Sequence, residues 1–123
     1  MVRLLIGLLA LLGAVLGLTW FFLADPRNLV AVNPDGLLSS GKRFGLEIGM
    51  PMKQAAARMS ALPGMRTLKV MQGGLCIGHA FQADREVMVL GDDSWRRGSV
   101  CLIGKSGRLE KIGWQYGFWP TFD

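Results

Sequence analysis

Hydrophobic residues are distributed along the chain in two different ways, one before and one after residue 25. From Leu4 to Leu23 the chain is apolar and carries no charged side chain. As an α-helix this stretch would span about 30 Å, which is the thickness of the hydrocarbon core of a bilayer. Later residues form short apolar runs between polar and glycine-rich segments, a pattern typical of a small globular domain.

Residues 49–62 carry the pattern of an amphipathic helix. Pro51 suits the first helical turn, and Pro63 and Gly64 end the helix. Its apolar side chains recur at spacings of three and four residues, and they are Met52, Ala55, Ala56, Met59 and Leu62. We expect this apolar face to pack on the core of the domain.

The chain after residue 64 changes to a pattern typical of β-strands. Short runs of residues that favour strands are separated by polar or glycine-rich segments, and they cover residues 66–72, 75–81, 86–90, 99–104 and 109–116. They predict an antiparallel meander of four or five strands. One helix on one face of this sheet makes a two-layer α+β domain.

Three segments follow from these patterns. Residues 1–24 form a transmembrane signal-anchor. Residues 25–43 contain the turn sequence Asn33-Pro34-Asp35-Gly36 and are expected to be a juxtamembrane linker or a small hairpin. Residues 44–123 form the α+β domain.

An uncleaved anchor and a cleaved signal peptide are both compatible with the start of the chain, since Ala24 could precede a cleavage site. The apolar stretch is longer than the ~7–15 residues of the hydrophobic region of a signal peptide, and Phe22 stands where a small residue is required. An anchor is therefore favoured. A short leading tail and a long following domain predict a single-pass protein of the inner (cytoplasmic) membrane, with its C-terminal domain facing the periplasm or the outside. Gly13 and Gly17 form a G-x-x-x-G pattern that would allow a homodimer of such helices.

The only two cysteines, Cys76 and Cys101, lie in two different predicted strands. Outside the cytoplasm they are expected to form a disulfide. His79 is the only histidine, and on a single strand over residues 75–81 its side chain and that of Cys76 would point to opposite faces. His79 is instead expected at the edge of the core, on the side of Leu75, Ile77 and Phe81.

Catalytic, cofactor and metal sites are not predicted, because the chain has no nucleophile elbow, phosphate-binding loop or C-x-x-C-H sequence. The alternative is an envelope metal-binding protein or enzyme that uses His79 with Cys76 or Cys101. The net charge is +5 with a pI near 9.8, but the basic residues are scattered. This argues against nucleic acid as a partner.

Two aromatic and basic segments are candidates for binding a protein partner. The loop over residues 91–98 contains Trp95, Arg96 and Arg97, residue types enriched at binding hot spots. The C-terminal tail adds Trp119 and Phe122 beyond the last predicted strand. A solvated hairpin tip for the loop, and packing on the protein's own core for the tail, are the alternative interpretations.

Residues 45–116 contain short motifs in a characteristic order: Gly49-Met50, then Leu62-Pro63-Gly64, then Gly107-Arg108-Leu109. This order resembles the BamE-like (SmpA/OmlA) envelope domains. The resemblance implies a helix packed on an antiparallel sheet, and a role in outer-membrane assembly through binding rather than catalysis. The expected function is therefore that of a membrane-anchored accessory or assembly factor of the cell envelope, with a small protein-binding domain.

Overall fold

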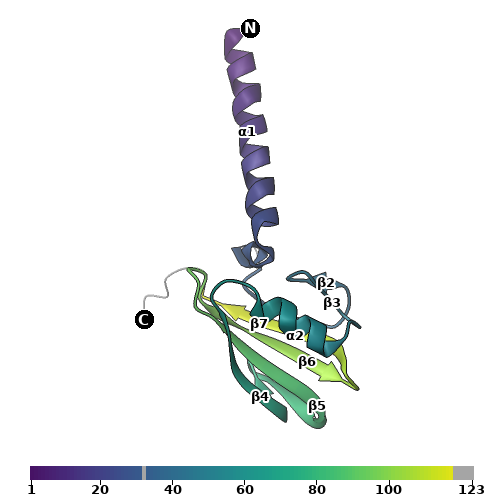
Figure 1. Cartoon of the computed structure of the whole chain (residues 1–123). Helices are drawn as coiled ribbons and strands as arrows, with labels where there is room; N and C mark the ends of the chain where they lie inside the picture. Colours follow the sequence, from purple (N-terminus) through teal and green to yellow (C-terminus); the bar gives the residue numbers. More distant parts are fainter. Residues whose placement is uncertain (32, 118–123) are drawn as a thin grey trace.

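A long apolar helix, α1 (Val2–Ala24), precedes a small α+β domain in the computed structural model, which describes residues 1–31 and 33–117. Figure 1 shows α1 extending away from the domain. None of its residues is buried. The helix is long and apolar enough to cross a membrane, as the Leu4–Leu23 stretch predicts.

The domain contains a five-stranded sheet in which every pairing is antiparallel. Its order is β1 (Asp35–Leu38), β7 (Arg108–Tyr116), β6 (Gly98–Lys105), β5 (His79–Asp92) and β4 (Met65–Cys76). Strands β4 to β7 form a meander, so the α+β class and the antiparallel meander are confirmed. The fifth strand, β1, comes from a part of the chain where no strand of this sheet was expected.

The described residues between 25 and 43 form regular elements that belong to the domain. They contain a short 3-10 helix, η1 (Pro26–Ala31), then β1, and then β2 (Lys42–Arg43), which pairs with β3 (Leu46–Glu47). Gly36 permits the close pairing of β1 with β7, because a Cβ at this position would lie 2.7 Å from the ring of Trp114. The Trp114 indole also donates a hydrogen bond of 2.9 Å to the Asn33 carbonyl.

One face of the sheet is covered by α2 (Met52–Ser60), which confirms the helix predicted over residues 49–62. Its buried residues are Met52, Ala55 and Met59. Backbone bonds tie its start to the β6–β7 turn, since the Met52 amide donates to the Gly107 carbonyl at 2.8 Å. The Leu109 amide likewise donates to the Met50 carbonyl at 2.8 Å.

The other face of the sheet is covered by the tip of the β4–β5 hairpin, which folds back across it. At the bend, residues 82–85 of β5 lie opposite the single residue Gly73 of β4. Gly73 has φ +67°, and a Cβ here would lie 2.7 Å from the Gln82 carbonyl oxygen, so the bend requires glycine. The disulfide between Cys76 and Cys101 joins the tip to β6.

The run over residues 75–81 is therefore not one strand, as expected, but the tip of this hairpin. Ile77 and Gly78 both have positive φ, 45° and 80°, as a two-residue hairpin turn requires. The tip packs closely on β7, because a Cβ at Gly113 would lie 2.5 Å from the Ile77 Cδ1 atom. Gly73-Gly74 and the polar segment over residues 82–85, which were expected to separate strands, mark the bend of this hairpin instead.

Candidate functional site

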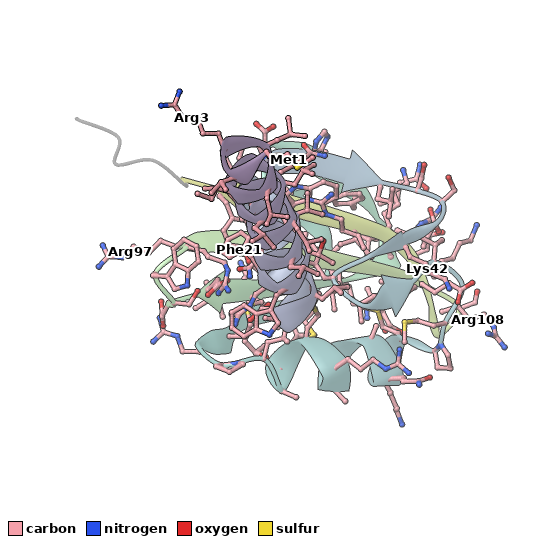
Figure 2. The ribbon with its side chains drawn as sticks, turned by 90° about the horizontal axis from the view of Figure 1, so that it is seen from above. Met1, Arg3, Phe21, Lys42, Arg97 and Arg108 are labelled. Carbon is pink, nitrogen blue, oxygen red and sulfur yellow. A yellow bond between two sulfur atoms is a disulfide. The ribbon has the colours of Figure 1, made fainter. Side chains whose placement is uncertain are left out.

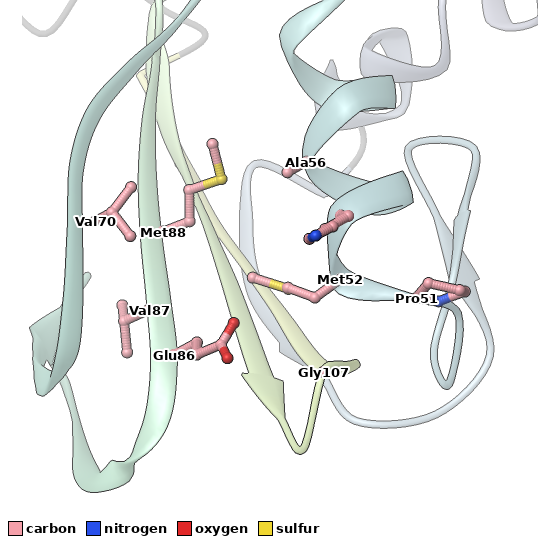
Figure 3. A pocket seen from close by; sticks show the side chains of 9 residues that line it. Pro51, Met52, Ala56, Val70, Glu86, Val87, Met88 and Gly107 are labelled. Atoms are coloured by element: carbon pink, nitrogen blue, oxygen red, sulfur yellow. The ribbon is translucent and has the colours of Figure 1, made fainter.

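An apolar groove of about 370 Å³ lies between α2 and the β4–β5 side of the sheet. Figure 3 shows Val70 and Met88 on the strands, with Met52 and Ala56 across from them on the helix. The groove is open because α2 is a nine-residue helix whose start is held at the β6–β7 turn. A helix of this length and placement leaves part of β4 and β5 uncovered.

Strand β4 forms one edge of the sheet, and among residues 1–31 and 33–117 it pairs only with β5. Three of its apolar side chains are strongly exposed: Leu68 at 52%, Val70 at 69% and Leu75 at 71%. An edge strand presents unpaired backbone amide and carbonyl groups, to which another extended chain can pair. The exposed Arg66 and Lys69 are charges of the kind that commonly limit unspecific pairing at such an edge.

The described residues among the predicted partner-binding set differ in exposure. Arg96 is buried, and its Nε and Nη2 donate to the Asn28 side-chain oxygen at 2.8 and 2.5 Å. Trp95 and Arg97, beside it in the β5–β6 loop, are exposed. Trp119 and Phe122 lie outside the described residues.

Arg96 belongs to a buried polar network where the chain leaves α1. At its centre, Arg27 donates through Nη1 to Asp92 at 3.1 Å and through Nη2 to Asp25 at 2.8 Å. The Tyr116 hydroxyl donates to the other oxygen of Asp92 at 2.8 Å. Burial and this hydrogen bond raise the pKa of Tyr116 well above its ordinary value. Sequence reasoning missed the network because its two groups, residues 25–28 and residues 92–116, lie far apart in the chain and only the fold brings them together.

Asp25 is the member of this network nearest to α1. Partial burial raises the pKa of the Asp25 carboxyl, but the hydrogen bonds and charge of Arg27 outweigh it, so the pKa lies below its ordinary value. The Asn28 side-chain amide donates to the Phe21 carbonyl near the end of α1. The rings of Phe21 and Trp95 lie 6.5 Å apart. The end of α1 is therefore held directly on the domain.

The environment of His79 differs from the expectation. Because the chain reverses at Ile77 and Gly78, Cys76 and His79 are direct partners across the hairpin and not alternating positions of one strand. The predicted separation onto opposite faces is therefore wrong. His79 and Leu75 are exposed, and only Ile77 and Phe81 of the expected set pack on the core. His79 lines a cavity of about 330 Å³ between the hairpin tip and β1.

The predicted disulfide between Cys76 and Cys101 is confirmed, with their Cα atoms 6.5 Å apart. Both sulfurs are bonded to each other, so a site using either thiol with His79 would first require reduction of the disulfide. Within residues 1–31 and 33–117, no three His, Cys, Asp or Glu side chains are grouped so as to hold a metal ion.

Fold and surface together define a small α+β domain attached to a single apolar helix, with an open sheet edge beside an apolar groove. Comparison of the chain with protein-family models, curated proteins and solved structures gives no match. The resemblance to the BamE-like domains therefore stays a prediction.

Proposed function

We propose that the protein is a single-pass, membrane-anchored envelope protein whose domain lies outside the cytoplasm and binds a protein partner without catalysing a reaction. Its role would be that of an accessory or assembly factor. The observation that carries this proposal is the unpaired edge of β4 beside the apolar groove. We infer that the partner contributes an extended, apolar segment that adds to the sheet as a further strand.

The chemistry of the groove supports this kind of partner. Backbone groups along β4 would supply hydrogen bonds that do not depend on the partner's sequence, and the groove would select apolar side chains. Met52 and Met88 line it, and methionine adapts its shape to different apolar groups. Exposed apolar side chains on an unpaired strand are otherwise a liability for a soluble surface.

Two further features support the proposed location. An apolar helix with no buried residue needs surroundings other than water, and a bilayer supplies them. The Cys76–Cys101 disulfide is typical of compartments outside the cytoplasm. A Cβ added at Gly13 or Gly17 would meet no atom within 4 Å, so this face of α1 is open, and close pairing of two α1 helices remains our proposal for a homodimer.

A photo-crosslinking amino acid placed at Val70 of the full-length protein in native membranes tests the proposal. We expect an adduct with one segment of one partner, which is mapped by peptide mass. A crosslinker at Leu68 should give the same adduct, and Val70→Asp should abolish it. The matched control is the same crosslinker at Gln115, which is exposed on β7, away from the β4 edge. Circular dichroism confirms that each variant folds.

Two results would contradict the proposal. An adduct of twice the chain mass would assign the β4 edge to a second copy of this protein. Equal labelling at Val70 and Gln115, or none at either position, would show that the edge has no specific occupant.

A further inference from the structure

A further cavity, of about 300 Å³, lies where α1 meets the domain. It combines apolar residues at the end of the helix with basic residues of the β2–β3 hairpin, and its lining is Phe22, Leu23, Pro26, Lys42, Arg43, Phe44 and Gly45. Figure 2, a view of the domain from the α1 side, shows Lys42 and Arg97 on opposite sides of the helix. Basic side chains therefore flank the point at which α1 enters the domain.

Arg43 is a cation without a charged partner among the described residues. Its Nη2 donates to the Asn33 carbonyl at 3.2 Å, and its guanidinium lies 4.3 Å from the ring centre of Trp114. Its Nε atom is buried and has no hydrogen-bond partner in this part of the chain. Burial lowers the pKa of Arg43, with no carboxylate to oppose the effect. An arginine cation that lines a cavity and that no described carboxylate balances points to an anionic ligand.

The position of the cavity relative to a bilayer indicates which anion is available. If α1 crosses the membrane, Phe22 and Leu23 lie at the end of the hydrocarbon core, and Asp25 is the first charged residue beyond it. The strongly exposed Trp20 suits the same interfacial level. Lys42 and Arg43 would then lie at the depth of the phosphate groups, with apolar surface on the hydrocarbon side.

We propose that this cavity binds the phosphate headgroup of an anionic glycerophospholipid, with Arg43 and Lys42 as its cationic ligands. Phe22 and Leu23 would lie beside the beginning of the acyl chains. Arginine suits this role because its fixed fork of donors matches phosphate oxygens. The inference rests on the proposed membrane anchoring of α1, and it adds a ligand class and a site to it.

The test uses the full-length protein in nanodiscs of phosphatidylcholine alone or mixed with phosphatidylglycerol. Lipids that stay bound after gentle extraction are counted by native mass spectrometry. We expect phosphatidylglycerol to be retained in preference to phosphatidylcholine. Arg43→Gln should reduce this preference about fivefold, as expected for a basic residue worth about 1 kcal/mol at a membrane surface. Arg43→Lys should keep most of it.

Arg66→Gln is the matched control, because Arg66 lies exposed on β4 and its loss changes the net charge equally. Lys42→Gln keeps the test decisive if Arg43→Gln does not fold, since the Lys42 side chain is 75% exposed. Equal retention of both lipids, or an equal effect of Arg66→Gln, overturns the lipid site. Displacement of phosphatidylglycerol by inorganic phosphate also overturns it, in favour of a soluble anion. Failure of the wild-type chain to enter nanodiscs of phosphatidylcholine alone would instead refute the membrane anchoring itself.

Discussion

Replacement of Asp92 by alanine tests whether the buried polar network holds the domain together. The Asp92 carboxylate accepts hydrogen bonds from the Arg27 guanidinium at 3.1 Å, from the Tyr116 hydroxyl at 2.8 Å and from the Ser94 amide at 2.9 Å. These three bonds link η1, the β5–β6 loop and β7 through one carboxylate, and Asp92→Ala removes it.

The expected cost follows from the burial of what remains. Arg27 is 1% exposed, so without Asp92 the one described carboxylate left to balance its charge is Asp25. The Tyr116 hydroxyl also loses its acceptor. Removing one partner of a buried ion pair lowers the free energy of unfolding by about 3–5 kcal/mol. This is a large part of the ~5–15 kcal/mol by which a domain is commonly stable. The melting temperature should fall by at least about 10 °C.

Asp93→Ala is the control next in the sequence. Asp93 is exposed and pairs with the exposed Arg66 at 3.3 Å, an interaction worth about 0–1 kcal/mol. Urea unfolding of the full-length variants in the same micelles, followed by tryptophan fluorescence and circular dichroism, measures both free energies of unfolding. If Asp92→Ala costs no more than Asp93→Ala, the network does not stabilise the domain and our reasoning is refuted.

Three further predictions concern titration and the disulfide. Tyr116 is the only tyrosine, and because burial and a hydrogen bond to a carboxylate raise its folded pKa, stability should be lost as pH rises above about 10. Its phenolate absorbance should appear only on unfolding, and ordinary titration of the folded protein would contradict this. Reduction of the Cys76–Cys101 bridge, which spans 25 residues, should lower the free energy of unfolding by about 3–3.5 kcal/mol in the loop-entropy model, and an unchanged urea midpoint would refute it. Burial raises the pKa of Asp25, but the hydrogen bonds and charge of Arg27 have the larger, opposite effect, so the folded pKa lies below its ordinary value. The stability that this carboxylate contributes is therefore present above about pH 4 and is lost as pH falls through the folded pKa. Asp25→Asn should weaken the acid dependence of the urea midpoint, and an unaltered dependence would count against the interaction.

The elements that sequence reasoning found are those whose signals are local. The uncharged stretch before Asp25 predicts α1, and the spacing of Met52, Ala55 and Met59 predicts α2, because helical periodicity is written in neighbouring residues. The Cys76–Cys101 pair was predicted from cysteine number and the inferred compartment. These inferences needed no knowledge of which strands lie side by side.

The features that were missed depend on contacts between distant residues. The sequence at Asn33 to Gly36 has the composition of a turn, yet Gly36 serves the packing of Trp114 on a strand. Gly73 lies between two predicted strands but forms a bend within one hairpin. The separate reversal at Ile77 and Gly78 pairs His79 with Cys76, which is why the environment expected for His79 was wrong.

For this protein, the sequence alone determined that an apolar helix precedes a domain with one amphipathic helix, a meander of strands and two cysteines suited to a disulfide. Only the tertiary structure decided that Arg96 is buried while Val70 is exposed, although their polarity suggests the opposite. The physical reason is that burial depends on what covers a side chain. Arg96 is covered because Asn28 and Asp25 satisfy its donors, whereas Val70 is uncovered because α2 does not extend across β4.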